Sequence, residues 1–87
     1  MMMAQVVGSI VSSQKDTSLI GTKLMIVQPI NSKKEGIRFQ QVAADTVGAG
    51  IGDYVLMVGG QSARLLFQEN RVAIDAAIVG IIDSFDQ

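Results

Sequence analysis

The sequence contains no cysteine, no histidine and no tryptophan, and it has one proline among its 87 residues. A chain without cysteine forms no disulfide and no thiolate metal site, which is compatible with a reducing cytoplasm. A chain without histidine lacks the side chain that most often transfers protons near neutral pH. These absences point away from catalysis and from metal binding.

Charged side chains are also scarce. They make up 17% of the chain, against roughly 25% in ordinary soluble domains, whereas hydrophobic residues make up 48%. A domain this small has too high a surface-to-volume ratio to bury so much apolar surface internally. We therefore expect the excess to be buried between the subunits of an obligate oligomer. The alternative is a monomer that is simply rich in valine, isoleucine and alanine.

The net charge of −1 gives no reason to expect a nucleic acid or an anionic membrane as a partner. Proteins that bind single strands need a basic groove and aromatic stacking platforms. This chain has only four aromatic residues, which are Phe39, Tyr54, Phe67 and Phe85. Its apolar runs stay below the ~18 residues of a membrane-spanning helix, and its first residues lack the basic segment of a signal peptide.

The two halves of the sequence differ in charge. Residues 1–41 contain five bases and two acids, a net charge of +3, and residues 42–87 contain two bases and six acids, a net charge of −4. In a ring, one surface of a subunit meets a different surface of its neighbour, so this difference would help to orient the subunits. The alternative is that so small a difference has no role.

Apolar, β-branched stretches separated by polar or glycine-rich turns predict five short strands. These are Ala4–Val11, Lys23–Gln28, Ile37–Ala44, Asp53–Val58 and Ala76–Phe85. Pro29 is expected to end the second strand because it cannot donate a ladder hydrogen bond. A change of apolar phase in the third strand predicts a bulge near Gln40 and Gln41. Ser62 is expected to cap a single helical turn over Ser62–Phe67.

Together these elements predict an all-β fold, a small five-stranded OB-like β-barrel with one short helix, in a single domain over residues 1–87. The middle strands are apolar on both faces, whereas an isolated barrel would leave its outer face in water and show cleaner alternation. A neighbouring subunit that covers the outer face would explain this pattern.

The segment Gly48-Ala49-Gly50-Ile51-Gly52 is the one candidate for a phosphate cradle. Phosphate-binding glycine loops lead into a helix, whereas these glycines lead into a predicted strand, so a tight turn is favoured. The aspartates at strand ends (Asp45, Asp53, Asp75 and Asp83) are expected to bond nearby backbone N–H groups. We predict no catalytic, cofactor-binding or metal-binding residues.

Three segments in a fixed order carry a resemblance: DTVGAGIGDYVL (Asp45–Leu56), GGQSAR (Gly59–Arg64) and IDAAIVGIID (Ile74–Asp83). Together they resemble the EutN/CcmL family, the pentameric vertex proteins of bacterial microcompartment shells. The first part of the chain, VVGSIVSSQKDTSLIGTKLMIVQ, is similar to the opening strands of that family. Among its members the carboxysomal CcmL type is especially similar. Gln61 departs from the family, which usually has a small residue there.

The resemblance implies a structural protein without enzymatic activity or cofactor. Its small β-barrel would form a homopentamer that caps the vertices of a carboxysome or a related catabolic compartment in the cytoplasm. Its partners would be the hexameric shell proteins that tile the flat facets. The competing hypothesis is a free oligomeric β-barrel module that binds a small ligand.

The resemblance also assigns residues to a subunit interface or to an axial opening. In the family's signature turn these are Asp45, Gly48, Ala49, Gly50 and Gly52, and in the Ala-Arg motif they are Ser62 and Arg64. Glycines permit close approach of neighbouring backbones. The planar guanidinium of Arg64 suits a carboxylate or a carbonyl across the interface, and the alternative is a solvated side chain.

Overall fold

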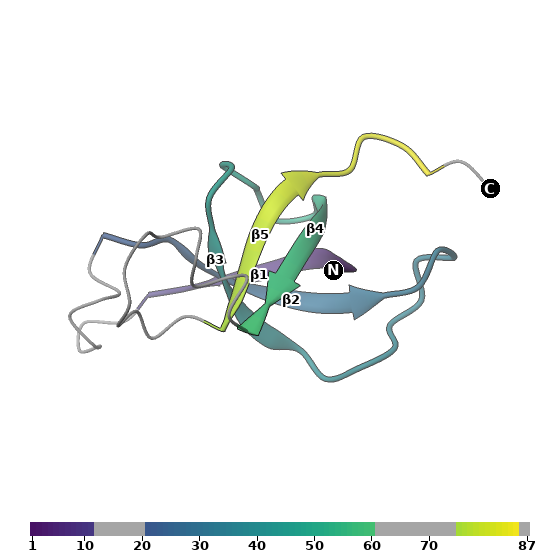
Figure 1. The fold of residues 1–87 in the computed structure, drawn as a ribbon, viewed down its shortest axis with the longest axis horizontal. Helices are drawn as coiled ribbons and strands as arrows, with labels where there is room; N and C mark the ends of the chain where they lie inside the picture. The colour runs from purple at the N-terminus through teal and green to yellow at the C-terminus, as the bar shows by residue number, and fades with distance from the viewer. Residues whose placement is uncertain (12–20, 61–74, 86–87) are drawn as a thin grey trace.

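Five strands close into a barrel in the computed structural model, which describes residues 1–11, 21–60 and 75–85 (Figure 1). The strands are β1 (Met2–Ile10), β2 (Leu24–Ile30), β3 (Gln41–Asp45), β4 (Tyr54–Gly59) and β5 (Ala76–Ile81). Around the barrel their order is β1-β2-β3-β5-β4. The contact between β3 and β5 is parallel, and the other four are antiparallel. The predicted five-stranded barrel is therefore confirmed, whereas the helical turn expected at Ser62–Phe67 lies outside the described residues.

The inside of the barrel is filled with apolar side chains from every strand, as in other small barrels. The buried cluster consists of Ala4, Val6, Met25, Val27, Ala43, Ala49, Val55, Met57, Ala76 and Ile78. Ala49 is the one member that comes from a loop, the loop that joins β3 to β4. Among the described residues, the interior is thus a core of packed apolar side chains.

Pro29 does not end the second strand, contrary to the sequence prediction. It lies within β2 and pairs with Ala4 of β1. On the other side of β2, no residue of β3 pairs with Pro29, since β3 pairs only with Leu24 to Val27. The carbonyl of Pro29 accepts a hydrogen bond from the N–H of Ile37 in the following loop at 3.1 Å. A proline fits here because no strand requires its missing N–H.

The third strand is shorter than predicted, and the predicted bulge is wrong. Residues 37–40 are exposed and belong to a loop, while β3 begins at Gln41 and pairs with β2 without a register shift. The change in the alternation of apolar residues that was noted near Gln40 and Gln41 therefore marks the start of β3. The bulges lie elsewhere, at Val7 in β1 and at Val79 in β5.

The fifth strand ends at Ile81, four residues before its predicted end at Phe85. Its antiparallel partner β4 begins at Tyr54, whose carbonyl accepts the N–H of Ile82 at 2.8 Å. Beyond that point none of the described strands continues beside the chain. Phe85 instead packs edge-on against the ring of Tyr54 with 5.5 Å between ring centroids, which holds the tail over β4.

Candidate functional site

The loop from Asp45 to Asp53 joins β3 to β4 and contains most of the candidate residues. Its first half is organised by the Asp45 carboxylate. Oδ1 accepts hydrogen bonds from the N–H groups of Val47 at 3.0 Å and Gly48 at 3.1 Å, and Oδ2 accepts one from Ala49 at 2.8 Å. The Asp45 side chain is only 1% exposed. A buried carboxylate with three backbone donors fixes the local chain.

Lys23, at the entrance to β2, supports the same turn from outside. Its Nζ lies 3.6 Å from Asp45 Oδ2 and donates a hydrogen bond to the carbonyl of Ala49 at 2.9 Å. The backbone N–H of Asp45 in turn donates to the carbonyl of Lys23 at 2.9 Å. Sequence reasoning missed Lys23, although a single cation that opens an apolar strand was the available signal.

The second half of the loop is held by Asp53 and by β1. Asp53 Oδ2 accepts the N–H of Gly50 at 2.8 Å. The N–H of Gly52 donates to the carbonyl of Val6 at 2.8 Å, and the N–H of Val6 donates to the carbonyl of Asp53 at 2.9 Å. The prediction that strand-end aspartates bond nearby backbone N–H groups is confirmed for Asp45 and Asp53.

These bonds decide between the tight turn and the phosphate cradle. The N–H groups of residues 47–50 already donate to the carboxylates of Asp45 and Asp53. These amides are therefore not available to bind an anion, and the two neighbouring carboxylates would repel one. The glycine segment is therefore a structural turn, as the sequence indicated.

The three glycines of the turn are not equivalent. Gly48 and Gly52 have φ angles of +81° and +97°, in the region that side chains disfavour. Gly50 has no such angle, and a Cβ built there would lie 3.7 Å from Asp53 Oδ2, an ordinary contact. The fold of one chain thus requires glycine at 48 and 52 but not at 50.

The same rigid loop presents apolar side chains outward. Ile51 is 68% exposed and Val47 is 40% exposed. Ile81, at the end of β5, is 41% exposed and pairs with Val55 near the end of the loop. Sequence reasoning did not assign these three residues to the site. The other candidates, Ser62 and Arg64, lie outside the described residues.

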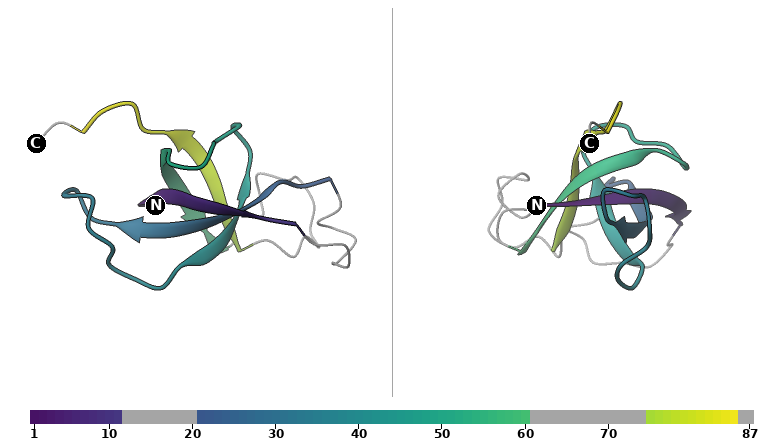
Figure 2. Two further views of the ribbon diagram at one scale, coloured as in Figure 1. Left: turned by 180° about the vertical axis from the view of Figure 1, so that it is seen from behind. Right: turned by 90° about the vertical axis from the view of Figure 1, so that its right-hand side faces the viewer.

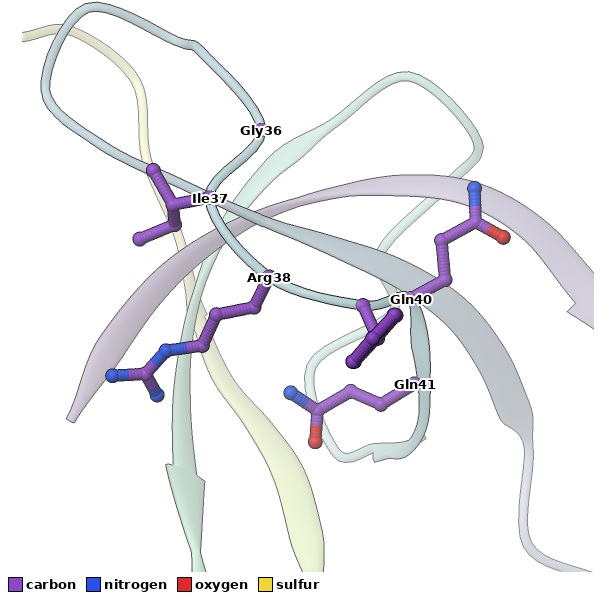
Figure 3. Close-up of a pocket in the computed structure, with 6 residues that line it drawn as sticks. Gly36, Ile37, Arg38, Gln40 and Gln41 are labelled. Atoms are coloured by element: carbon purple, nitrogen blue, oxygen red, sulfur yellow. The ribbon is translucent and has the colours of Figure 1, made fainter.

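A second loop contains the hollow shown in Figure 3, which is lined by the consecutive residues Gly36 to Gln41. Phe39 is 94% exposed there, and Ile37 is 52% exposed. A hollow along one side of a single exposed loop does not enclose a small molecule in the way that ligand pockets do. In the described ranges, no group of three acidic side chains is placed to hold a metal ion, and no helix is long and apolar enough to cross a membrane.

Comparison with known proteins assigns the family. Residues 1–83 match the family model described as "Ethanolamine utilisation protein EutN/carboxysome". The chain belongs to the EutN/CcmL family. It is 46% identical over 88 residues to the bacterial microcompartment shell vertex protein PduN of Salmonella typhimurium, covering 97% of both chains. It is 42% identical to the carboxysome shell vertex protein CcmL of a Nostoc species, covering 97% of this chain and 84% of that protein.

The fold agrees with solved structures of the EutN/CcmL family. The pentameric microcompartment shell protein GrpN from Rhodospirillum rubrum superposes with a TM-score of 0.90 at 41% identity, over 100% of this chain and 99% of that one. The resemblance inferred from the sequence is thus confirmed, with CcmL among several similar types. The names of these relatives describe structural shell components rather than enzymes.

Proposed function

We propose that this EutN/CcmL chain is a structural shell protein whose homopentamer caps the vertices of a bacterial microcompartment. The observation that carries the proposal is the match, over its whole length, to a shell protein described as pentameric, at 41% identity and a TM-score of 0.90. The excess of apolar residues supports it, because the buried interior of such an assembly extends across subunit boundaries.

The vertex role follows from geometry. Flat facets tiled by hexamers do not close into a shell, and a five-fold unit at each corner supplies the missing curvature. The partners are therefore hexameric shell proteins, and the chain resides in the shell of a carboxysome or a catabolic compartment. Sealing the corners keeps the enclosed enzymes and their intermediates inside.

Within the pentamer, we assign the turn with Asp45, Gly48, Ala49, Gly50 and Gly52 to the contact between subunits or to the rim of the axial opening. Its internal hydrogen bonds support this role, since a rigid loop loses little conformational entropy when it is packed against a neighbour. We assign Ser62 and Arg64 to the same contact, where the guanidinium would bond to a carboxylate or a carbonyl of the next subunit.

Native mass spectrometry of the purified chain at micromolar concentration tests the proposal. We expect a single species of five copies. A mass of one or two copies would overturn the proposal, and a hexamer would preserve a ring but not a vertex. In cells that make a shell, deletion of the gene should leave open shells, and expression of this chain should restore closed ones.

The alternative of a free small-ligand-binding barrel receives little support from the structure. Its binding site would be the mouth of the barrel, with the interior of the barrel behind it. The interior is filled by the buried apolar cluster, and Ala49, with 0% of its surface exposed, belongs to that cluster.

A further inference from the structure

The exposed apolar side chains gather on two separate surfaces. In the described part of the chain nine large hydrophobic residues are exposed. Two of them, Met1 and Val11, lie beyond the ends of β1. The other seven form two groups. The first group, which we name the β2 face, consists of Val7, Ile37, Phe39 and Val42. The second group, which we name the loop face, consists of Val47, Ile51 and Ile81.

The β2 face lies over the outer side of β1, β2 and β3. Ile26 at its centre pairs with Gly8 on one side and with Val42 on the other. A Cβ built at Gly8 would lie 3.3 Å from Ile26 Cδ1. The Ile26 side chain therefore occupies space that a side chain at position 8 would need. The loop that carries Phe39 is tied to the same side, because Gln28 Nε2 donates to the carbonyl of Arg38 at 2.8 Å.

The loop face lies at the end of the barrel where β3 leads into β4 and where β5 ends. The hydroxyl of Thr46, just before Val47, donates to the carbonyl of Ile78 at 2.6 Å. Figures 1 and 2 show the loop between β3 and β4 at a different place on the barrel from the loop between β2 and β3, although the tip of the second loop reaches the start of β4, where Lys34 Nζ lies 5.0 Å from the centre of the Tyr54 ring. The two faces share no residue, so one subunit can use both at once.

Each face has an exposed charged side chain beside it, and these two side chains differ in sign. Arg38 is exposed next to Phe39 on the β2 face, whereas Asp83 is exposed two residues beyond Ile81 on the loop face. A ring joins its subunits head to tail, so it requires two different surfaces that complement each other on every copy. Two different apolar surfaces, one with Arg38 beside it and the other with Asp83 beside it, meet that requirement.

We propose that the occupant of the β2 face is a second copy of this chain, which contributes its loop face. Phe39 of one subunit then packs against Ile51 and Val47 of the next, and Arg38 faces Asp83. An exposed aromatic side chain beside an arginine is the type of residue that dominates binding energy at interfaces. The inference rests on the proposed homopentamer and specifies how its subunits are joined.

Two variants test this pairing without disturbing the core, since both side chains point into solvent. We expect Phe39→Glu and Ile51→Glu each to shift the native mass from five copies to one. The control is Val11→Glu, which removes a 98% exposed side chain outside both faces and should stay pentameric. Circular dichroism of each variant should retain the β spectrum. If a glutamate variant loses it, the matching serine variant replaces it.

A mixture of the two variants gives the decisive result. In a head-to-tail contact, Phe39→Glu retains an intact loop face and Ile51→Glu retains an intact β2 face. The mixture should therefore form heterodimers that cannot grow into a ring. Homodimers of the single variants, or a mixture that stays monomeric, would overturn the pairing. Pentamers of both variants would overturn the inference alone, whereas a wild-type chain that is not pentameric would overturn the proposed function and this inference with it.

Discussion

At the scale of single residues, the Asp45 carboxylate and the Lys23 ammonium differ in importance although they form one ion pair. Asp45 is 1% exposed and accepts three backbone hydrogen bonds, whereas Lys23 is 54% exposed. Removal of a buried acceptor leaves its donors unsatisfied, and that penalty exceeds the small contribution of an exposed ion pair. The carboxylate should therefore control the stability of the loop.

We expect Asp45→Ala to lower the free energy of unfolding by about 2–4 kcal/mol, because three N–H groups lose a charged acceptor. Lys23→Met should lower it by less than about 1 kcal/mol, since water replaces an exposed cation readily. Urea denaturation at one fixed protein concentration measures both, because the stability of an oligomer depends on concentration. Asp75→Ala, at an exposed carboxylate, is the control. Equal losses for Asp45 and Lys23 would contradict the argument.

At the scale of elements, the sequence allowed the number of strands and their approximate places in the chain to be predicted, but not all their limits or their order around the barrel. Alternation and turn residues located the barrel because they report burial of each strand face. The ends of β2, β3 and β5 depend on how far a partner strand extends, and no local pattern encodes that length. Pro29 shows this clearly, since its place inside β2 depends on where β3 starts.

The candidate site, like the strands, could be predicted only in part from the sequence. The glycine turn and the role of its aspartates followed from residue type, because glycine and aspartate have few common uses at a strand end. Lys23 lies 26 residues before Ala49 in the sequence, so its contact with the turn depends on the pairing of β2 with β3. The bulges at Val7 and Val79 were missed because a bulge depends on the register of two strands.

The bulge in β1 gives a prediction about packing on the outer face. An added Cβ at Gly8 would lie 3.3 Å from Ile26 Cδ1, whereas one at Gly80 would lie 3.6 Å from Leu56 Cδ1. Gly8→Ala should therefore be less favourable than Gly80→Ala by about 1 kcal/mol, because only the first crowds its neighbour. Thermal unfolding at fixed concentration measures the difference.

Ile26→Val provides the control for this packing, because it removes the methyl group nearest to the added Cβ. In that background the penalty of Gly8→Ala should fall by about 1 kcal/mol, as a double-mutant cycle would show. Additive effects of the two substitutions would mean that Gly8 has no packing role toward Ile26.

At the scale of the whole molecule, Gly50 is a position where the fold of one chain and the assembly of the ring have different requirements. Within the chain a Cβ at position 50 makes only an ordinary contact, and φ is not positive. If the turn packs against a neighbouring backbone, the pentamer alone has a reason to require glycine there. Gly50→Val should then give a folded barrel that fails to form pentamers and leaves shells open in cells.

Gly48→Val is the matched control for this variant, because φ at Gly48 is +81° and a side chain there strains the chain itself by about 1–2 kcal/mol. Circular dichroism and native mass spectrometry together distinguish the two variants. Gly48→Val should lower the melting temperature of the barrel, whereas Gly50→Val should leave the β spectrum intact and shift the mass to one copy. A Gly50→Val ring of normal stability that seals shells would show that no neighbour approaches the turn at this residue.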